Sequence, residues 1–126
     1  MRTQREMARH AFDEVCKARD EKYVDNEPER NRFRAYCMKT PSMIQRFGLP
    51  QTLAFLKARR FDAAGHYLRV LQSVVNEEDL LNQAVSAGLE GYFAHTRAAL
   101  TAAGWLRRFA QAELPVSKDS TAQPEV

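Results

Sequence analysis

Residues that commonly carry out catalysis are few in this chain of 126 residues and lie far apart along it. The histidines His10, His66 and His95 form neither an H-x-x-x-H nor an H-E-x-x-H pattern, so their spacing does not indicate a zinc site. His10 would share a helix face with the acids three and four positions later, but such spacings arise freely in charged helices. The 5 glycines are scattered singly and form no phosphate loop. We therefore expect no catalytic residue, no metal site and no cofactor.

Two other groups of reactive side chains have structural explanations. The acids at 77–79 are consecutive and cannot all face one ion from a helix, so we expect them at the positive end of a helix capped by Asn76. Cys16 and Cys37 lie within apolar patterns and have no C-x-x-C spacing. Free cysteines of this kind usually behave as small buried apolar residues.

The positive charge is concentrated in the first half of the chain. Residues 1–60 hold 14 Lys plus Arg against 8 Asp plus Glu, which gives +6, whereas residues 61–126 hold 5 against 8, which gives −3. Such asymmetry favours a polyanion as a partner of one surface, with a solvated face of ion pairs as the alternative. No stretch reaches the roughly 20 apolar residues that span a bilayer, so we expect a cytoplasmic protein without a membrane partner.

The elements that position these charges are predicted to be helices throughout. Apolar residues recur at spacings of three and four, and no run alternates as a half-buried strand does. We predict an all-α fold, a single compact bundle of about six helices over residues 1–113, followed by a disordered tail at 114–126. In the first helix, charges such as Arg9 and Asp13 pair at i,i+4, which favours a solvated face there.

The second helix should start at Asn26 and end near Thr40, a later one should be capped by Asp62, and the longest should run from about 91 to 112. Basic residues interleave with Phe33 and Tyr36, a pattern that could suit RNA, although aromatic residues at helical spacing more often belong to a core. The buried faces are expected to contain Phe33, Tyr36 and Cys37, then Ala64, Tyr67, Leu68, Leu71, Val74 and Val75, and then Leu89, Tyr92, Phe93, Thr96, Leu100, Ala103 and Leu106.

The stretch MIQRFGLPQTLAFLKARR at 43–60 allows two interpretations. Gly48 can end one helix and Pro50 can begin the next, which predicts a rigid corner of a helical bundle. The same turn resembles a DNA-binding helix-turn-helix, and a regulator of that kind is the alternative function. The residues at 53–56 are apolar nearly all round, and Ile44 stands where the motif usually has alanine or glycine, so we favour the corner.

Two segments of the sequence also resemble a known family. The run PSMIQRFGLPQTLAFLKAR and the later run AALTAAGWLRRFAQAEL resemble segments of the small-subunit family of the type III-B CRISPR-Cas RNA-silencing (Cmr) effector complex, in the same order. The matching residues are Pro41, Ile44, Gly48, Leu49, Leu53, Ala54, Phe55 and Leu56, and then Trp105, Leu106, Arg108, Phe109 and Ala110. Most of them are apolar residues that pack helices rather than residues of a site.

The resemblance implies a non-catalytic, RNA-binding subunit of a ribonucleoprotein that takes part in antiviral defense. Its partners would be the backbone and large subunits of the complex, further copies of itself in a filament, and the guide RNA (crRNA) with its target RNA. Backbone subunits would supply the carboxylates that cut, while several copies of the small subunit would stack beside them and shield the target strand. Contacts with phosphates would suffice, because base pairing with the guide already reads the sequence.

We expect contacts with RNA from basic residues that lack an obvious acidic partner at i,i+4. Arg30 and Arg34 would even repel one another, which suggests that something external neutralises them; the alternative for each residue is a role in solubility alone. The candidates are Arg30, Arg32, Arg34, Lys39, Arg46, Lys57, Arg59, Arg60, Arg107 and Arg108.

Overall fold

The computed structural model describes residues 2–114, and within them the chain folds into six α-helices and one π-helical turn, with no strand. This confirms the predicted all-α fold. The helices are α1 (Gln4–Lys17), α2 (Glu27–Phe47), α3 (Leu49–Ala58), α4 (Asp62–Val75), α5 (Leu80–Ser86) and α6 (Leu89–Glu113), and the π-helical turn η1 (Ala18–Lys22) follows α1. No helix in this part of the chain is long and apolar enough to cross a membrane.

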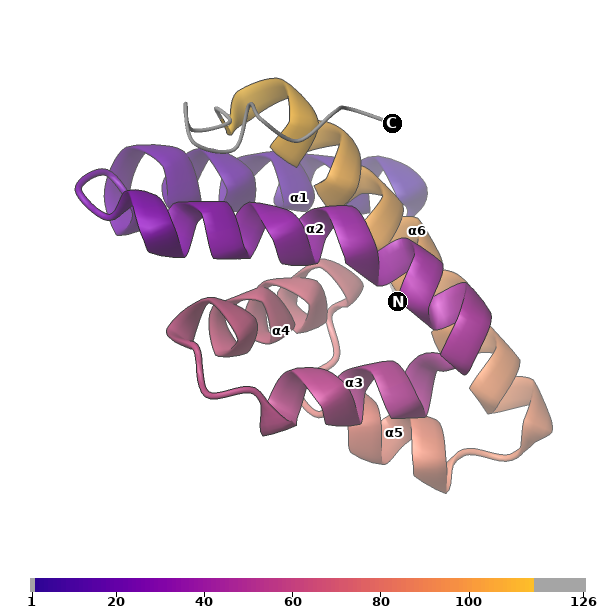
Figure 1. The fold of residues 1–126 in the computed structure, drawn as a ribbon. Coiled ribbons are helices and arrows are strands. Elements are labelled where there is room, and N and C mark those ends of the chain that lie inside the picture. The colour runs from indigo at the N-terminus through magenta and orange to yellow at the C-terminus, as the bar shows by residue number, and fades with distance from the viewer. Residues whose placement is uncertain (1, 115–126) are drawn as a thin grey trace.

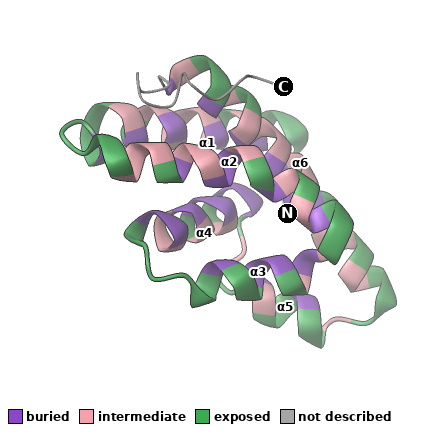
Figure 2. Ribbon diagram, in the orientation of Figure 1, coloured by how far each residue is buried: buried purple, intermediate pink, exposed green. Residues whose placement is uncertain are grey.

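Helices α1 and α2 both pack against α6, and α4 packs beneath all three (Figure 1). The shorter helices α3 and α5 form the other side of the molecule and contact each other. Helix α3 also contacts α4, and α5 contacts α6. Buried residues line the sides of α3 and α4 that face the rest of the molecule, and the outer side of α3 is exposed (Figure 2).

Helix α6 packs through Ala103 and Leu106 of the predicted apolar face and through small residues beside them. Ala99, Ala102 and Ala103 are completely buried, and alanine at these positions lets α6 approach α1 and α2 closely. Leu89 and Phe93 were expected in the core but are 71% and 53% exposed. The prediction was wrong for these two residues because the first turns of α6 extend beyond the helices that cover its middle (Figure 1).

Helix α2 continues through Pro41 to Phe47, so the predicted end near Thr40 is wrong. A proline inside a helix removes one hydrogen bond and strains the turn before it. The Thr40 hydroxyl donates to the carbonyl of Tyr36 at 2.7 Å, and the guanidinium of Arg107 on α6 donates to the carbonyl of Met38 at 3.1 Å. These bonds go to the carbonyls on either side of Cys37, whose own carbonyl is the one that Pro41 leaves without a donor, and α2 bends there but does not end (Figure 1).

The predicted corner at Gly48 is confirmed. Gly48 has φ of +85°, which a residue with a Cβ adopts only under strain, and an added Cβ would lie 3.2 Å from the hydroxyl of Tyr92. Pro50 lies in the first turn of α3, where its missing N–H is not needed. The hydroxyl of Thr52 donates to the carbonyl of Gly48 at 2.9 Å, so the direction in which α3 leaves α2 is fixed.

The ends of α4 differ from those predicted. The side chain of Asp62 caps no N–H; instead the carboxylate of Glu29, on α2, accepts a hydrogen bond of 2.9 Å from the N–H of Ala63. Asn76 ends α4 in the left-handed conformation rather than starting α5, whose cap is Asp79. Asparagine commonly caps the start of a helix, but it is also among the few residues other than glycine that adopt the left-handed conformation readily. The residue type alone therefore did not distinguish the end of α4 from the start of α5.

The core behind α2 and α4 contains a cluster of rings. Phe33 stacks on the imidazole of His66 with centroids 4.7 Å apart, and Tyr67 lies 6.1 Å from Phe33. The hydroxyl of Tyr23 lies 2.7 Å from Nδ1 of His66. Cys37 is buried beside this cluster and is free, as is Cys16, so the predicted unpaired cysteines are confirmed.

The C-terminal end of α6 is fixed by contacts with earlier parts of the chain. Leu114 is 2% exposed and its carbonyl accepts a hydrogen bond of 3.3 Å from Nε of Arg34. Arg19 in η1 forms an ion pair with Glu113. The helical domain therefore includes Leu114, one residue beyond the predicted boundary, and the rest of the tail, 115–126, lies outside the described residues.

Candidate nucleic-acid interface

The basic residues of the chain are gathered in one segment that contains no acid. Between Arg30 and Phe61 there is not one Asp or Glu, although eight of the ten candidate residues lie within that span. This segment forms most of α2, all of α3 and the turn into α4. The structure divides its cations into two groups according to what their side chains contact.

Three candidates are half-buried and bonded to the protein itself. Arg30 pairs with Glu27 at 3.4 Å, and its side chain is only 16% exposed. Arg34 and Arg107 donate to the carbonyls of Leu114 and Met38. Groups of the protein itself therefore offset the expected repulsion between Arg30 and Arg34, and neither residue requires an external anion. Counting acids at i,i+4 missed these partners, because one lies at i−3 and the others are main-chain carbonyls.

The remaining seven candidates are exposed. Lys39 lies on α2, and Arg108 on α6 lies over the ring of Trp105 at 5.2 Å. Arg46 lies at the end of α2, with its guanidinium 5.5 Å from the ring of Phe47. The structure thus does not gather all ten residues on one surface. It does place the four remaining exposed candidates together, namely Arg32, Lys57, Arg59 and Arg60.

The end of α3 and the turn into α4 form an exposed surface of four cations and two rings, which we call the α3 corner. Arg59 lies over the ring of Phe55 at 4.9 Å, and Arg32 lies over the ring of Phe61 at 4.2 Å. Lys57 and Arg60 lie between these rings in the sequence and are exposed. The α3 corner is defined by Arg32, Phe55, Lys57, Arg59, Arg60 and Phe61.

One acid contacts the α3 corner, and its main effect is to hold the surface in place. Glu29 pairs with Arg32 at 2.5 Å through one oxygen and accepts from the N–H of Ala63 through the other. Among residues 2–114, Lys57, Arg59 and Arg60 form no ion pair. When Glu29 and the exposed Asp62 next to Phe61 are both counted, the corner combines a charge of about +2 with a rigid connection between α2 and α4.

Sequence reasoning selected the cations of the α3 corner but missed its rings. Phe55 was placed in the core with the whole run 53–56, whereas only Leu53 and Leu56 of that run are buried and Phe55 is 37% exposed. Phe61 is 41% exposed. The detectable signal was Phe55 with Arg59 at i,i+4 in a segment without acids, since such a pair shares one helix face.

The first turns of α3 do not present base-reading side chains. Leu49 and Thr52 are buried, and Ile44 on the preceding helix is 2% exposed. Gln51 is the exposed polar residue of this first part of the helix. A recognition helix needs several exposed polar side chains at its start, so the geometry favours the packing corner over the helix-turn-helix.

The residues considered for catalysis are dispersed. Burial, with smaller contributions from Lys22 and Arg69, lowers the pKa of His66 to about 4, so this imidazole is neutral near pH 7, and its Nδ1 shares a hydrogen bond with the hydroxyl of Tyr23. His95 contacts the carbonyl of Gly91 through Nδ1 at 2.7 Å. Within residues 2–114 no three His, Cys, Asp or Glu side chains lie close enough together to hold a metal ion.

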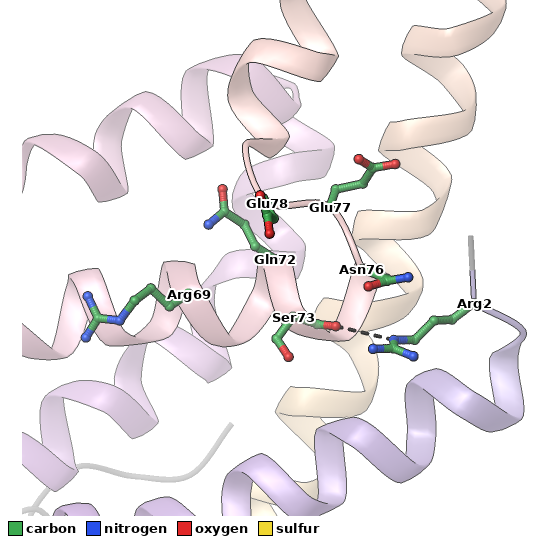
Figure 3. Close-up of a pocket in the computed structure, with 7 residues that line it drawn as sticks. All are labelled: Arg2, Arg69, Gln72, Ser73, Asn76, Glu77 and Glu78. Carbon is green, nitrogen blue, oxygen red and sulfur yellow. Dashed lines mark hydrogen bonds between the residues drawn. The ribbon is translucent and has the colours of Figure 1, made fainter.

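An open hollow of about 270 Å³ lies at the C-terminal end of α4 (Figure 3). In it, Nε of Arg2 donates to the carbonyl of Ser73 at 3.3 Å, where a cation also opposes the negative end of the helix dipole. The other lining residues shown, among them Asn76, Glu77 and Glu78, bring no nucleophile and base together. This hollow is explained by the joining of the N-terminus to α4.

Comparison with known proteins agrees with this fold. A family model described as CRISPR-associated protein (Cas_Cmr5) matches residues 3–113. The chain belongs to the Cmr5 family. The CRISPR system Cmr subunit Cmr5 of Thermus thermophilus is 35% identical over 86 residues, which are 66% of this chain and 75% of that protein.

Structural similarity extends further than the sequence match. The crystal structure of a CRISPR-associated Cmr5 family protein from Thermus thermophilus superposes with a TM-score of 0.81 at 31% identity, covering 91% of this chain and 100% of the other. The resemblance to the Cmr small-subunit family is therefore confirmed. Six of the 13 residues that carried it are buried, so the core contributes nearly half of the family features; they are Ile44, Leu49, Leu53, Leu56, Leu106 and Ala110.

Proposed function

We propose that this protein is a non-catalytic small subunit of a Cmr RNA-silencing complex and that it binds the target RNA strand through the α3 corner. Membership of the Cmr5 family supports the first part. The observation that carries the second part is the set of three exposed cations, Lys57, Arg59 and Arg60, which pair with no acid of residues 2–114 and lie next to two exposed rings.

Binding through this surface depends on charge rather than on base sequence. Each phosphate that a lysine or arginine neutralises releases counterions, so affinity falls as salt rises. Arg46 extends the positive surface to the other end of α3. It lies just before this helix, which has ten residues and is about 15 Å long, and Lys57 lies in the last turn. A strand of RNA lying along α3 would meet cations at both ends of the helix.

We propose further that copies of the subunit stack through an apolar surface near α5 and the start of α6. Exposed side chains there are Val85, Leu89 and Phe93, which are 60%, 71% and 53% exposed, with Phe47 at the adjacent end of α2. Gly48, next to Phe47, lies against Tyr92 of α6, which places these segments side by side. Exposed apolar groups in one area are typical of protein contacts, and this area is separate from the α3 corner.

The decisive experiment compares two charge reversals that change the net charge equally. Arg59→Glu with Arg60→Glu removes two cations of the α3 corner, whereas Arg5→Glu with Arg97→Glu removes two exposed cations elsewhere. Binding of labelled single-stranded RNA and of duplex DNA is measured over a salt series, with the isolated protein and with the assembled complex. We expect the corner variant to lose RNA affinity about tenfold or more and to lower the salt slope by about 1.4, and the control to change little.

Equal losses in the two variants would overturn the placement of RNA on the α3 corner. Sequence-selective binding to duplex DNA would instead support the helix-turn-helix regulator. Failure to co-purify with other Cmr subunits and a guide RNA would contradict membership of the complex. Leu89→Ser with Phe93→Ser should prevent copies from stacking while leaving the net charge, and so the RNA affinity of the single subunit, unchanged.

A further inference from the structure

We infer that Phe55 and Phe61 stack on unpaired bases, so that the α3 corner binds RNA whose bases are exposed and discriminates against a phosphate backbone alone. The inference rests on the proposed function, because it concerns what the same surface recognises. It adds a base-dependent contact to a surface that otherwise would respond only to charge.

The first observation is the exposure of the two rings. The protein buries Phe33 and Tyr67 completely, yet it leaves Phe55 and Phe61 37% and 41% exposed at the positively charged surface. Neither exposed ring is among the aromatic pairs of the core within residues 2–114. Packing within the protein therefore does not account for large apolar side chains at these positions.

The second observation is the placement of a guanidinium over each ring. Arg32 lies 4.2 Å from the centroid of Phe61, and Arg59 lies 4.9 Å from that of Phe55. A planar guanidinium stacks on aromatic faces and on nucleobases alike, and it carries the charge that attracts a phosphate. Each pair thus offers a stacking surface and a phosphate contact within the reach of one nucleotide.

The third observation is the rigidity of one of these pairs. The guanidinium of Arg32 is fixed by Glu29, which in turn accepts from the N–H of Ala63 at the start of α4. Phe61 lies immediately before α4, so its backbone is fixed by the same connection. A ring held in place before binding loses little conformational freedom when a base stacks on it.

Charge favours nucleic acid over a protein as the occupant of this surface. The exposed cations next to the rings have no acid between Arg30 and Phe61 to offset them, apart from the contact of Glu29 with Arg32. The apolar surface around Leu89 and Phe93 differs, because in residues 2–114 no cation–π pair involves Phe93 and only Phe47 at the edge of that surface is paired, with Arg46. Stacking on exposed rings is tolerant of sequence, since every base has a flat face.

The test uses the full chain with two RNA strands of equal length and charge, one with all bases and one with several abasic positions; a fully paired duplex of the first strand is the third probe. The variant Phe55→Ala with Phe61→Ala is compared with Phe93→Ala, another exposed phenylalanine, and with Phe55→Trp, which retains a stacking surface. Affinities are measured by fluorescence anisotropy over a salt series, and circular dichroism checks that each variant folds.

We expect the natural protein to bind the strand with bases at least about tenfold more tightly than the abasic strand, and more tightly than the duplex despite the greater charge of the duplex. Phe55→Ala with Phe61→Ala should abolish this difference between the two strands without changing the salt slope, and Phe93→Ala and Phe55→Trp should preserve it. Equal affinity for the strands with and without bases would overturn the inference but leave the proposed function intact.

Two further outcomes distinguish a failure of this inference from a failure of the proposed function. If no probe binds, either to the isolated protein or in the assembled complex, the proposed function itself fails. If Phe55→Ala with Phe61→Ala prevents co-purification with other subunits while RNA affinity is unchanged, the rings contact protein and the inference is wrong.

Discussion

Arginine is used differently on the two sides of helix α2. Where α2 packs against α6, Arg34 and Arg107 donate to main-chain carbonyls and are half-buried. At the α3 corner, Arg32 and Arg59 lie over exposed phenylalanine rings. The comparison teaches that the number of cations in a segment does not locate an anion-binding surface; the groups that already contact each guanidinium do.

The largest effect should come from removing the arginines that bond to carbonyls. Arg34→Met with Arg107→Met removes two partly buried hydrogen bonds of charged groups to main-chain carbonyls, and we expect the free energy of unfolding to fall by about 2–3 kcal/mol. Urea denaturation followed by the fluorescence of Trp105, the single tryptophan, measures it. The matched control, Arg59→Met with Arg60→Met, should stay within about 0.5 kcal/mol of the natural protein. Similar losses in the two variants would remove the distinction between the two groups.

Acid should weaken the interior behind the α3 corner and leave the charge of the corner unchanged. The folded-state pKa of His66 is about 4, below its ordinary value near 6.5, so the unfolded chain binds more protons in between. The stability contribution is therefore complete above pH 6.5 and is lost as pH falls towards 4. Allowing for partial exposure, we expect a loss of about 1–2 kcal/mol over this window.

The control for this pH dependence is His66→Gln, measured with the natural protein by urea denaturation between pH 7 and pH 5. The variant should show a shallower dependence, because it lacks the imidazole that takes up a proton when the chain unfolds. RNA affinity at low salt should remain constant over the same range, since lysine and arginine stay charged. Parallel pH profiles for the two proteins would show that burial of His66 is not responsible.

Glu29→Gln should change both the stability of the protein and the charge of the α3 corner. The amide oxygen can still accept from the N–H of Ala63, but the ion pair with Arg32 is lost, so we expect the free energy of unfolding to fall by about 1 kcal/mol. RNA affinity should rise about two- to threefold at low salt, because the surface gains one unit of positive charge. A fall in affinity would mean that fixing Arg32 matters more than its free charge.

The smallest effect should come from Arg108, a candidate that the structure places on α6 over Trp105. Arg108→Gln removes one exposed cation–π contact, which is worth about 0.5 kcal/mol. Because Arg108 lies outside the α3 corner, RNA affinity should change less than twofold at moderate salt. A loss as large as that of Arg59→Gln would extend the RNA surface onto α6.

The fold was largely predictable because helical periodicity and turn residues are local signals. The helices near Asn26 and Asp62 and the corner at Gly48 begin or end within a few residues of the positions that the sequence indicates. The continuation of α2 through Pro41 was not predictable, since α2 packs against α4 and α6 on both sides of the proline and Met38 accepts a hydrogen bond from Arg107, 69 positions later. A rule about proline describes only its immediate neighbours.

The candidate site was predictable in its charge and not in its rings or its internal contacts. Periodicity assigns an apolar residue to a helix face, but it does not say where the neighbouring helices stop covering that face. Phe55 and Phe93 were therefore placed in the core, although both are exposed. Arg34 and Arg107 were placed on the surface because carbonyl acceptors far along the chain leave no trace in the local pattern.

The hydrogen bond from Arg107 to Met38 has a consequence for the order in which the protein becomes functional during synthesis. The side chains of the α3 corner lie between residues 32 and 61, yet Met38 on α2 receives a hydrogen bond from a residue near the end of the chain. The contacts of Glu29 with Arg32 and Ala63, which hold the corner itself, lie within the first half of the chain. We therefore expect the corner to take shape during synthesis before α6 fixes the position of α2.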